Sequence, residues 1–134
     1  MLIDCVFCKI CAKKLPGKII YQDTVLSCFL PEKMKVYGHS LIVSNKHYEN
    51  IFDIPEEKLI HIIKFAQKIS LHFKERLGAT GINILHASGK SAQQSVPHFH
   101  IHIFPRFDDD GLDTWPKLEK KGYDSDEVLA KIKF

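Results

Sequence analysis

Three histidines alternate with apolar residues late in the sequence, in the order His98-Phe99-His100-Ile101-His102. In an extended strand alternate side chains share a face, so the imidazoles would point one way and the apolar residues the other. Neighbouring imidazoles would be ~6.6 Å apart and the outer pair ~13 Å apart, at a rise of ~3.3 Å per residue. Because Zn–N bonds are only about 2.0–2.1 Å long, one ion would not easily bind all three, and we expect the histidines to have different roles.

The chemistry of this row depends on its surroundings. Neutral imidazole is a competent nucleophile at pH 7, and a neighbour on its other ring nitrogen sets its tautomer. The polar loop 86–95, with Gly89 and Gln94, precedes the row, and its small and amide side chains can cradle an anion. Two other interpretations stay open: a catalytic metal centre, and imidazoles that bond only to backbone groups or water on a polar sheet face.

Cysteines give a second candidate cluster. Cys5, Cys8 and Cys11 follow one another at three-residue steps, and no secretion signal precedes them. Reduced thiols at this spacing favour a metal site over a disulfide, although free thiols remain the alternative. A tetrahedral site on two of them needs two further ligands. Cys28 lies in an apolar run and is expected to be a small buried hydrophobic residue.

Composition limits the class of protein. The 134 residues are 45% hydrophobic and 26% charged, which is typical of one folded domain spanning residues 1–134. No apolar run reaches the roughly 18–20 residues of a membrane span, so no membrane association is expected. A formal net charge of +3 permits an anionic ligand but is far from a nucleic-acid-binding surface. We therefore expect a cytoplasmic protein that binds no nucleic acid.

The chain alternates short strand-like runs with one long helical run. Strand formers bounded by turn residues predict five strands, at 19–21, 25–30, 39–44, 82–85 and 98–104, the last closed by Pro105. A short helix is expected from Ser125 to the end. Strands joined mostly by short turns, with one helix between the third and fourth, predict an α+β domain with a mainly antiparallel five-stranded sheet.

The long helix is predicted over residues 55–77. Asp53 is placed to cap its start, and Gly78 follows its end. An apolar stripe at three- and four-residue steps should pack on the sheet. It comprises Leu59, Ile62, Ile63, Ala66, Ile69, Phe73 and Leu77.

These motifs closely resemble the histidine triad (HIT) superfamily of nucleotide hydrolases and transferases. The resemblance is carried by five segments of the chain: 5–10 (CVFCKI), 37–43 (YGHSLIV), 46–47 (KH), 81–85 (GINIL) and 94–106 (QSVPHFHIHIFPR). It covers residues 5 to about 116. It implies a HIT-like fold and a homodimer paired across the helix and the fourth strand.

The resemblance also implies a mechanism. His100, the middle histidine, would attack the α-phosphorus of a nucleotide and form a covalent nucleotidyl-imidazole intermediate that water hydrolyses. His98 and His102 would bind phosphate oxygens or hold the geometry, and Ser95 would lie near the leaving group. The implied nucleotide-binding set is Gln94, Glu32, Ser88, Asn83 and His102.

In this set the chain departs from the family pattern at two places. Glu32 stands beside Pro31, where the family usually has a ribose-binding acid or amide, and Ser88 follows Ala87, where it usually has a phosphate-binding amide. In the loop after Glu32, Lys33 and Lys35 would lie close to the pocket, and for either lysine a phosphate contact competes with the more common role of solvated surface charge.

A zinc site is implied for one branch of the superfamily, which includes small zinc-containing HIT proteins. The matching ligands here are Cys5, Cys8, His47 and His98, a closed structural Zn²⁺ site that would brace the catalytic strand. The N-terminal segment 1–15 would then be the zinc-binding segment, and 105–134 a C-terminal tail.

The expected function follows from the nucleophile. It is a nucleotide phosphoramidase or dinucleoside polyphosphate hydrolase acting on an AMP-like purine nucleotide. The alternative is a regulatory nucleotide-binding module of the same fold with weak or no turnover.

Overall fold

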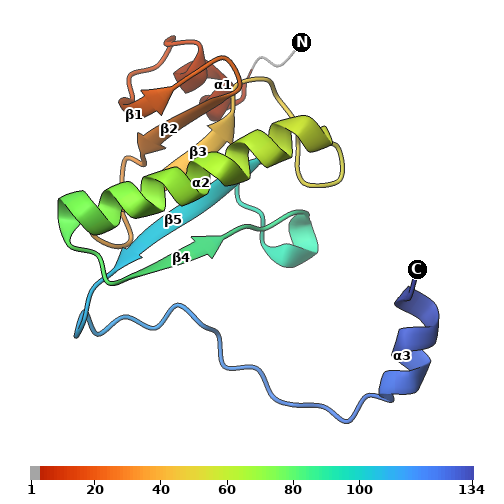
Figure 1. Ribbon diagram of the computed structural model, residues 1–134. Helices are drawn as coiled ribbons and strands as arrows, with labels where there is room; N and C mark the ends of the chain where they lie inside the picture. The colour runs from red at the N-terminus through yellow and green to blue at the C-terminus, as the bar shows by residue number, and fades with distance from the viewer. Residues whose placement is uncertain (1–3) are drawn as a thin grey trace.

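A five-stranded antiparallel sheet forms the centre of the molecule, which we describe from a computed structural model for residues 4–134. Its strands lie in the order β1-β2-β3-β5-β4, as Figure 1 shows. They are β1 (Lys18–Gln22), β2 (Leu26–Leu30), β3 (Ser40–Ser44), β4 (Gly81–Leu85) and β5 (His100–Arg106). The predicted α+β class and antiparallel sheet are confirmed.

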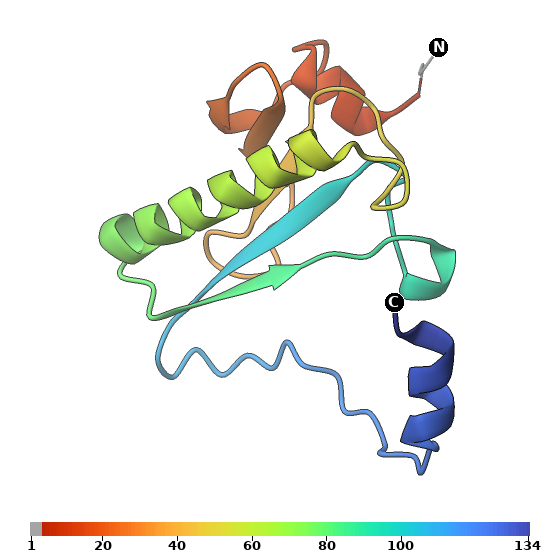
Figure 2. The ribbon, with the colours of Figure 1, turned by 45° about the vertical axis from the view of Figure 1, so that its right-hand side comes forward.

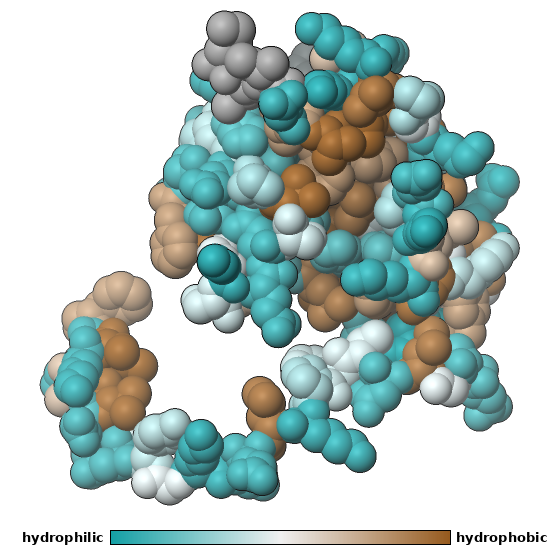
Figure 3. All heavy atoms as spheres, turned by 180° about the vertical axis from the view of Figure 1, so that it is seen from behind, coloured by the Kyte–Doolittle hydropathy of each residue, from teal (hydrophilic) through white to brown (hydrophobic). Residues whose placement is uncertain are grey.

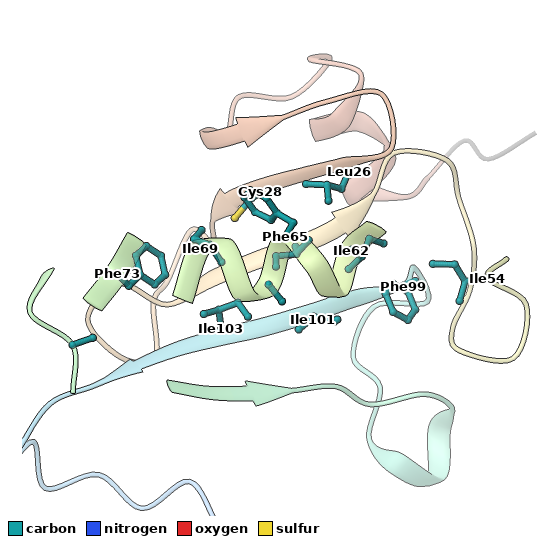
Figure 4. Close-up of a cluster of buried hydrophobic side chains, with 13 residues drawn as sticks. Leu26, Cys28, Ile54, Ile62, Phe65, Ile69, Phe73, Phe99, Ile101 and Ile103 are labelled. Atoms are coloured by element: carbon teal, nitrogen blue, oxygen red, sulfur yellow. The ribbon is translucent and has the colours of Figure 1, made fainter. Parts of the chain in front are cut away.

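The long helix α2 (Glu56–Leu77) crosses one face of the sheet. Its buried side chains pack on those that β5 and the residue before it direct to the same face, as Figure 4 shows. The helix contributes Ile62, Phe65, Ala66, Ile69 and Phe73, and the sheet contributes Phe99, Ile101 and Ile103. The apolar half of the histidine segment therefore anchors it to α2, and the predicted alternation of faces is correct.

The ends of α2 follow the prediction only in part. Gly78 ends the helix with φ 74°, a left-handed conformation that glycine adopts without steric cost. Asp53 does not cap the start, because Pro55 occupies the N-cap and makes no side-chain cap bond. The Asp53 carboxylate instead accepts the backbone N–H groups of Glu49 and Asn50 and closes its own turn.

The buried stripe of α2 also differs from the prediction at one position. Ile63 is half exposed, whereas Phe65 is buried and stacks on Tyr21 with ring centroids 4.5 Å apart. Residue 63 lies about 100° around the helix from Ile62, at the edge of the face that meets the sheet. Spacing alone fits both residues, and only the orientation of the helix on the sheet distinguishes them.

The strand β5 begins and ends later than predicted. His98 precedes it, and the strand continues through Pro105, which pairs with Ile82 of β4. The prediction that Pro105 closes the strand is wrong because the pairing of β5 with β3 stops at Ile103, opposite Ser40, the first residue of β3. Beyond Ile103 only β4 pairs with β5, and proline is tolerated at such an edge position.

A short helix and a small apolar cluster lie on the other face of the sheet. The helix α1 (Val6–Cys11) buries Phe7 against Phe29, Leu41 and Val43 of β2 and β3. Residues 1–3 of the expected zinc-binding segment 1–15 lie outside the described residues. This face carries the histidine row, so α1 brings cysteines and histidines together.

The C-terminal arm leaves the body of the molecule after β5. It ends in the predicted short helix, α3 (Ser125–Ile132), which Figure 2 shows standing apart from the sheet. Figure 3 shows apolar side chains on this helix separated from the body; Leu129 and Ile132 are 55% and 67% exposed. None of the helices in residues 4–134 is long and apolar enough to cross a membrane.

Candidate functional site

Two cysteines and two histidines converge at one end of the histidine row. The ligand atoms of Cys5, Cys8, His47 and His98 all lie within 4.8 Å of one another. The Nδ1 of His98 is 3.2 Å from the Cys5 Sγ and 3.5 Å from the Cys8 Sγ, and the Nδ1 of His47 is 3.4 Å from the Cys8 Sγ. The structure thus brings together all four predicted metal ligands from α1, the loop after β3 and the residue pair before β5.

The donor set fits a tetrahedral zinc ion. The Nε2 of His98 donates to the Ser44 carbonyl oxygen at 2.6 Å, so its Nδ1 carries the lone pair that faces the two thiols. A metal-bound histidine commonly has this kind of support at its other nitrogen. Burial raises the pKa of the Cys8 thiol to about 11, and a divalent cation would supply the charge needed to hold it as a thiolate.

The third cysteine of the segment does not join this cluster. The Cys11 Sγ lies 3.9 Å from the Ser44 carbonyl oxygen, to which it donates. Cysteine spacing alone does not distinguish Cys11 from Cys5. The difference comes from the short helix, whose N-cap Cys5 turns toward His98.

The middle histidine is held in a defined tautomer. The Nδ1 of His100 lies 2.7 Å from the backbone oxygen of His98. A carbonyl oxygen only accepts, so Nδ1 carries the proton and Nε2 carries the lone pair. Burial also lowers the pKa of His100, which keeps the ring neutral at pH 7.

The Nε2 of His100 is open although the residue is only 5% exposed. Within residues 4–134 this atom makes no hydrogen bond, and no fully buried side-chain nitrogen or oxygen there lacks a partner. The Nε2 atom therefore keeps some contact with solvent. The edge of Phe7 packs on the ring at 5.1 Å between centroids and limits its movement.

His39, within the segment 37–43 and without a predicted role of its own, determines the tautomer of His102. The backbone N–H of Lys35 donates to Nδ1 of His39 at 3.1 Å, so neutral His39 carries its proton on Nε2. That Nε2 lies 2.9 Å from Nδ1 of His102 and donates to it. Neutral His102 must then carry its own proton on Nε2, as a hydrogen-bond donor.

Burial supports these neutral forms. It lowers the pKa of both His39 and His102 to about 4, and the positive charge of Lys35 adds to the effect on each. His39 is 2% exposed in an otherwise apolar segment. Its place beside an apolar run is the sequence signal that could have identified this role. A histidine buried there needs a hydrogen-bond partner, because buried polar groups are nearly always paired.

Comparison with known proteins gives the family. Residues 12–109 match the model of the HIT domain. The chain belongs to the HIT domain family. An uncharacterized HIT-like protein from Methanocaldococcus jannaschii is 39% identical, over 96% of this chain and 98% of that one.

Two further members of the HIT family bear on the site. The adenosine 5'-monophosphoramidase HNT1 of Saccharomyces cerevisiae is 32% identical, over 96% of this chain and 82% of that protein. The crystal structure of a zinc-bound histidine triad family protein from Mycobacterium smegmatis superposes with a TM-score of 0.81 at 31% identity, covering 89% of this chain and 86% of that one.

Several expected nucleotide-binding residues of this HIT domain already have protein partners. Gln94 braces the loop before the triad, since its Oε1 accepts the N–H of Gly89 and its Nε2 donates to the Glu49 carbonyl oxygen. The Ser88 hydroxyl accepts the N–H of Ile51 and lies 2.5 Å from the Nε2 of His86.

Of the remaining side chains expected to contact the nucleotide, one already makes hydrogen bonds within the protein and two do not. The Oδ1 of Asn83 accepts from Arg106 and from Thr114, both at 2.9 Å, which ties it to the start of the C-terminal arm. Ser95 and Glu32 are exposed, and their side chains make no hydrogen bond within residues 4–134. Of the five side chains Gln94, Ser88, Asn83, Ser95 and Glu32, only the last two need break no protein hydrogen bond to contact a ligand.

Proposed function

We propose that this HIT domain is a nucleotidyl hydrolase in which Nε2 of His100 attacks the α-phosphorus of an AMP-like purine nucleotide. The observation that carries the proposal is the hydrogen bond from Nδ1 of His100 to the backbone oxygen of His98. It leaves a neutral ring with a solvent-accessible lone pair at Nε2, which is the form of imidazole that can act as a nucleophile. The yeast relative named as an adenosine 5'-monophosphoramidase supports this substrate class.

The reaction has two balanced steps. In the first, Nε2 of His100 forms a bond to phosphorus while the bond from phosphorus to the leaving nitrogen or oxygen breaks. The leaving group takes a proton from solvent or through the exposed hydroxyl of Ser95. In the second, water attacks phosphorus and gives up its proton to solvent, the bond to Nε2 breaks, and neutral His100 is restored with AMP as the product.

Charge develops on the phosphate oxygens during both steps. The Nε2–H of His102 is the neutral donor on the same face of β5, with its ring centroid 5.1 Å from that of His100. Its proton is held in place by the hydrogen bond from His39. A preorganised donor of this kind stabilises the transition state more than the substrate.

The zinc site would act through structure. When bound, Zn²⁺ would supply the charge that holds Cys5 and Cys8 as thiolates. The residues of this chain do the rest, because His98 holds the cluster through its ring and orients His100 through its backbone oxygen. Loosening the cluster should therefore misdirect His100, even though no reacting atom touches the metal.

Substrate binding would use the open residues first. Glu32 would accept the ribose hydroxyls, and the Gln94 loop would present backbone N–H groups to the phosphate. Ser88 and Asn83 could join the set only by giving up His86 and Arg106 as partners, so we assign them a supporting role in the free protein.

Two copies of the chain would pair across β4 and α2 to form a homodimer. The strand β4 is an edge of the sheet, and Ile84 on it is 51% exposed. On α2, Ile60 and Ile63 are 52% and 50% exposed. Apolar side chains and an unpaired strand edge are features that a second copy would cover.

The test is to trap the intermediate. Wild-type protein is mixed with an adenosine 5'-phosphoramidate, quenched, and examined by peptide mass spectrometry for an AMP adduct on His100. His100→Ala should lose at least about 10³-fold in kcat, whereas the matched control His72→Ala, on the exposed side of α2, should not change. Binding of nucleotide without an adduct would favour the regulatory module, and loss of the chemical step with an intact fold on chelation would favour a catalytic metal.

A further inference from the structure

The loop between β2 and β3 places the backbone of a lysine next to the histidine that bonds to the triad. Lys35 lies four residues before His39, and its backbone N–H is bonded to the Nδ1 of that histidine. His39 in turn bonds to His102 at 2.9 Å. The backbone of Lys35 is therefore two hydrogen bonds away from a ring of the triad.

The side-chain charge of Lys35 also reaches the triad. Burial is the main cause that lowers the pKa of His39 and His102, and the Lys35 charge lowers the pKa of both as well. The other groups acting on His102 are His100, His39 and His86, none of which is acidic. The charge of Lys35 thus acts on His102, and the groups that shift the pKa of this ring include no carboxylate.

Lys35 is available to a ligand. Its side chain is exposed and takes part in no ion pair within residues 4–134. Arg106, the cation at the far end of β5, is by contrast held bidentately by Asp110, with both N–O distances 2.8 Å. A positive charge that is open beside a phosphate site is a binding group for a polyanion.

The histidines themselves cannot neutralise a highly charged substrate. His39 and His102 are neutral at pH 7, and His102 offers one N–H donor. A monophosphoramidate brings little charge beyond the reacting phosphate, whereas a dinucleoside polyphosphate brings several adjacent phosphate groups. The second class of substrate needs a cation next to His102, and the first does not.

We propose that Lys35 forms an anion subsite beside His102 that binds a second phosphate group of the substrate, and so gives this protein a preference for dinucleoside polyphosphates over phosphoramidates of AMP. The proposal rests on the proposed function for its turnover but not for its binding. The subsite is built by a loop position that also supports His39, so the lysine side chain can be changed while the backbone hydrogen bond is kept.

The experiment compares Lys35→Met with Lys35→Arg and with the matched control Lys33→Met, two residues away on the same loop. Binding of diadenosine tetraphosphate and of AMP is measured by calorimetry in the His100→Ala background, where no turnover occurs. We expect Lys35→Met to weaken binding of the tetraphosphate about tenfold, that of AMP less than about twofold, and Lys35→Arg to restore most of it. In the protein with His100 intact, kcat/KM should change in the same ratio.

Other results would overturn the subsite. An equal loss for both ligands would mean that Lys35 acts on the fold or on His39, and no loss for either would mean that the lysine is a solvated surface charge. The same is true if Lys33→Met reproduces the effect. The outcome for the proposed function is separate, because it depends on the His100 adduct and not on the affinity measured in the His100→Ala background.

Discussion

Replacing His39 tests the tautomer chain from Lys35 to His102 most directly. His39→Ala removes two hydrogen bonds, of 3.1 Å and 2.9 Å, each worth about 1 kcal/mol, and leaves a cavity at a residue that is 2% exposed. We expect the free energy of unfolding to fall by about 2–3 kcal/mol. Without the donor on its Nδ1, His102 can place its proton on either nitrogen, so its Nε2–H no longer always faces the substrate.

The effect on catalysis should exceed the effect on binding. We expect kcat/KM for an AMP phosphoramidate to fall about 10- to 100-fold, mostly through kcat, because the donor acts on charge that develops in the transition state. His39→Gln should recover part of the loss, since its amide can accept at one atom and donate at the other. Steady-state kinetics are read beside ¹⁵N NMR of the His102 ring, which reports the tautomer.

An exposed histidine on α2 provides the control for His39→Ala. His72→Ala removes an exposed histidine from α2 and should leave both readouts unchanged. If His39→Ala keeps kcat/KM within about twofold while the NMR shows a mixed tautomer at His102, the donor at Nε2 is not needed and the electrostatic argument fails. A fixed tautomer without His39 would refute the chain of hydrogen bonds itself.

Three other predictions concern stability and assembly. Cys5→Ser should release zinc and lower the melting temperature, measured by metal analysis and calorimetry, and zinc-free wild-type protein would contradict it. Burial raises the pKa of Asp23, but hydrogen bonds from His61 and two backbone N–H groups outweigh burial and lower the pKa to about 2. The ionised carboxylate therefore stabilises the fold above pH 3.8, and this stabilisation is lost as the pH falls through about 2. Asp23→Asn should therefore lower the free energy of unfolding by about 1–2 kcal/mol at pH 7 and make stability depend less on pH in acid. An acid-unfolding transition that is the same in wild type and variant would count against a stabilising role of the Asp23 hydrogen bonds. Ile84→Lys on the β4 edge should shift a dimer to monomer in analytical ultracentrifugation, and a wild-type monomer would dismiss the proposed pairing.

Much of the fold could be predicted because its signals are local. Alternating residues around His100 predict a strand with two different faces, and Gly78 predicts where α2 ends. The wrong predictions concern positions where the local sequence fits two structures equally well and a neighbouring segment of the fold selects one. Ile63 and Phe65 both fit the helical spacing, and Pro105 continues its strand because the pairing with β3 has already stopped at Ile103.

The sequence by itself determined which residue types could do chemistry here: a row of imidazoles on one strand face, thiols at metal-ligand spacing and a family resemblance that names His100. Only the tertiary structure decided the proton positions, since the bond between His39 and His102 joins residues 63 positions apart. It also decided that Cys5 and Cys8 meet His47 and His98, because residues from 39 to 93 positions apart in the chain must be brought together. A tautomer and a metal site both depend on contacts at about 3 Å, which long-range packing creates and local sequence does not specify.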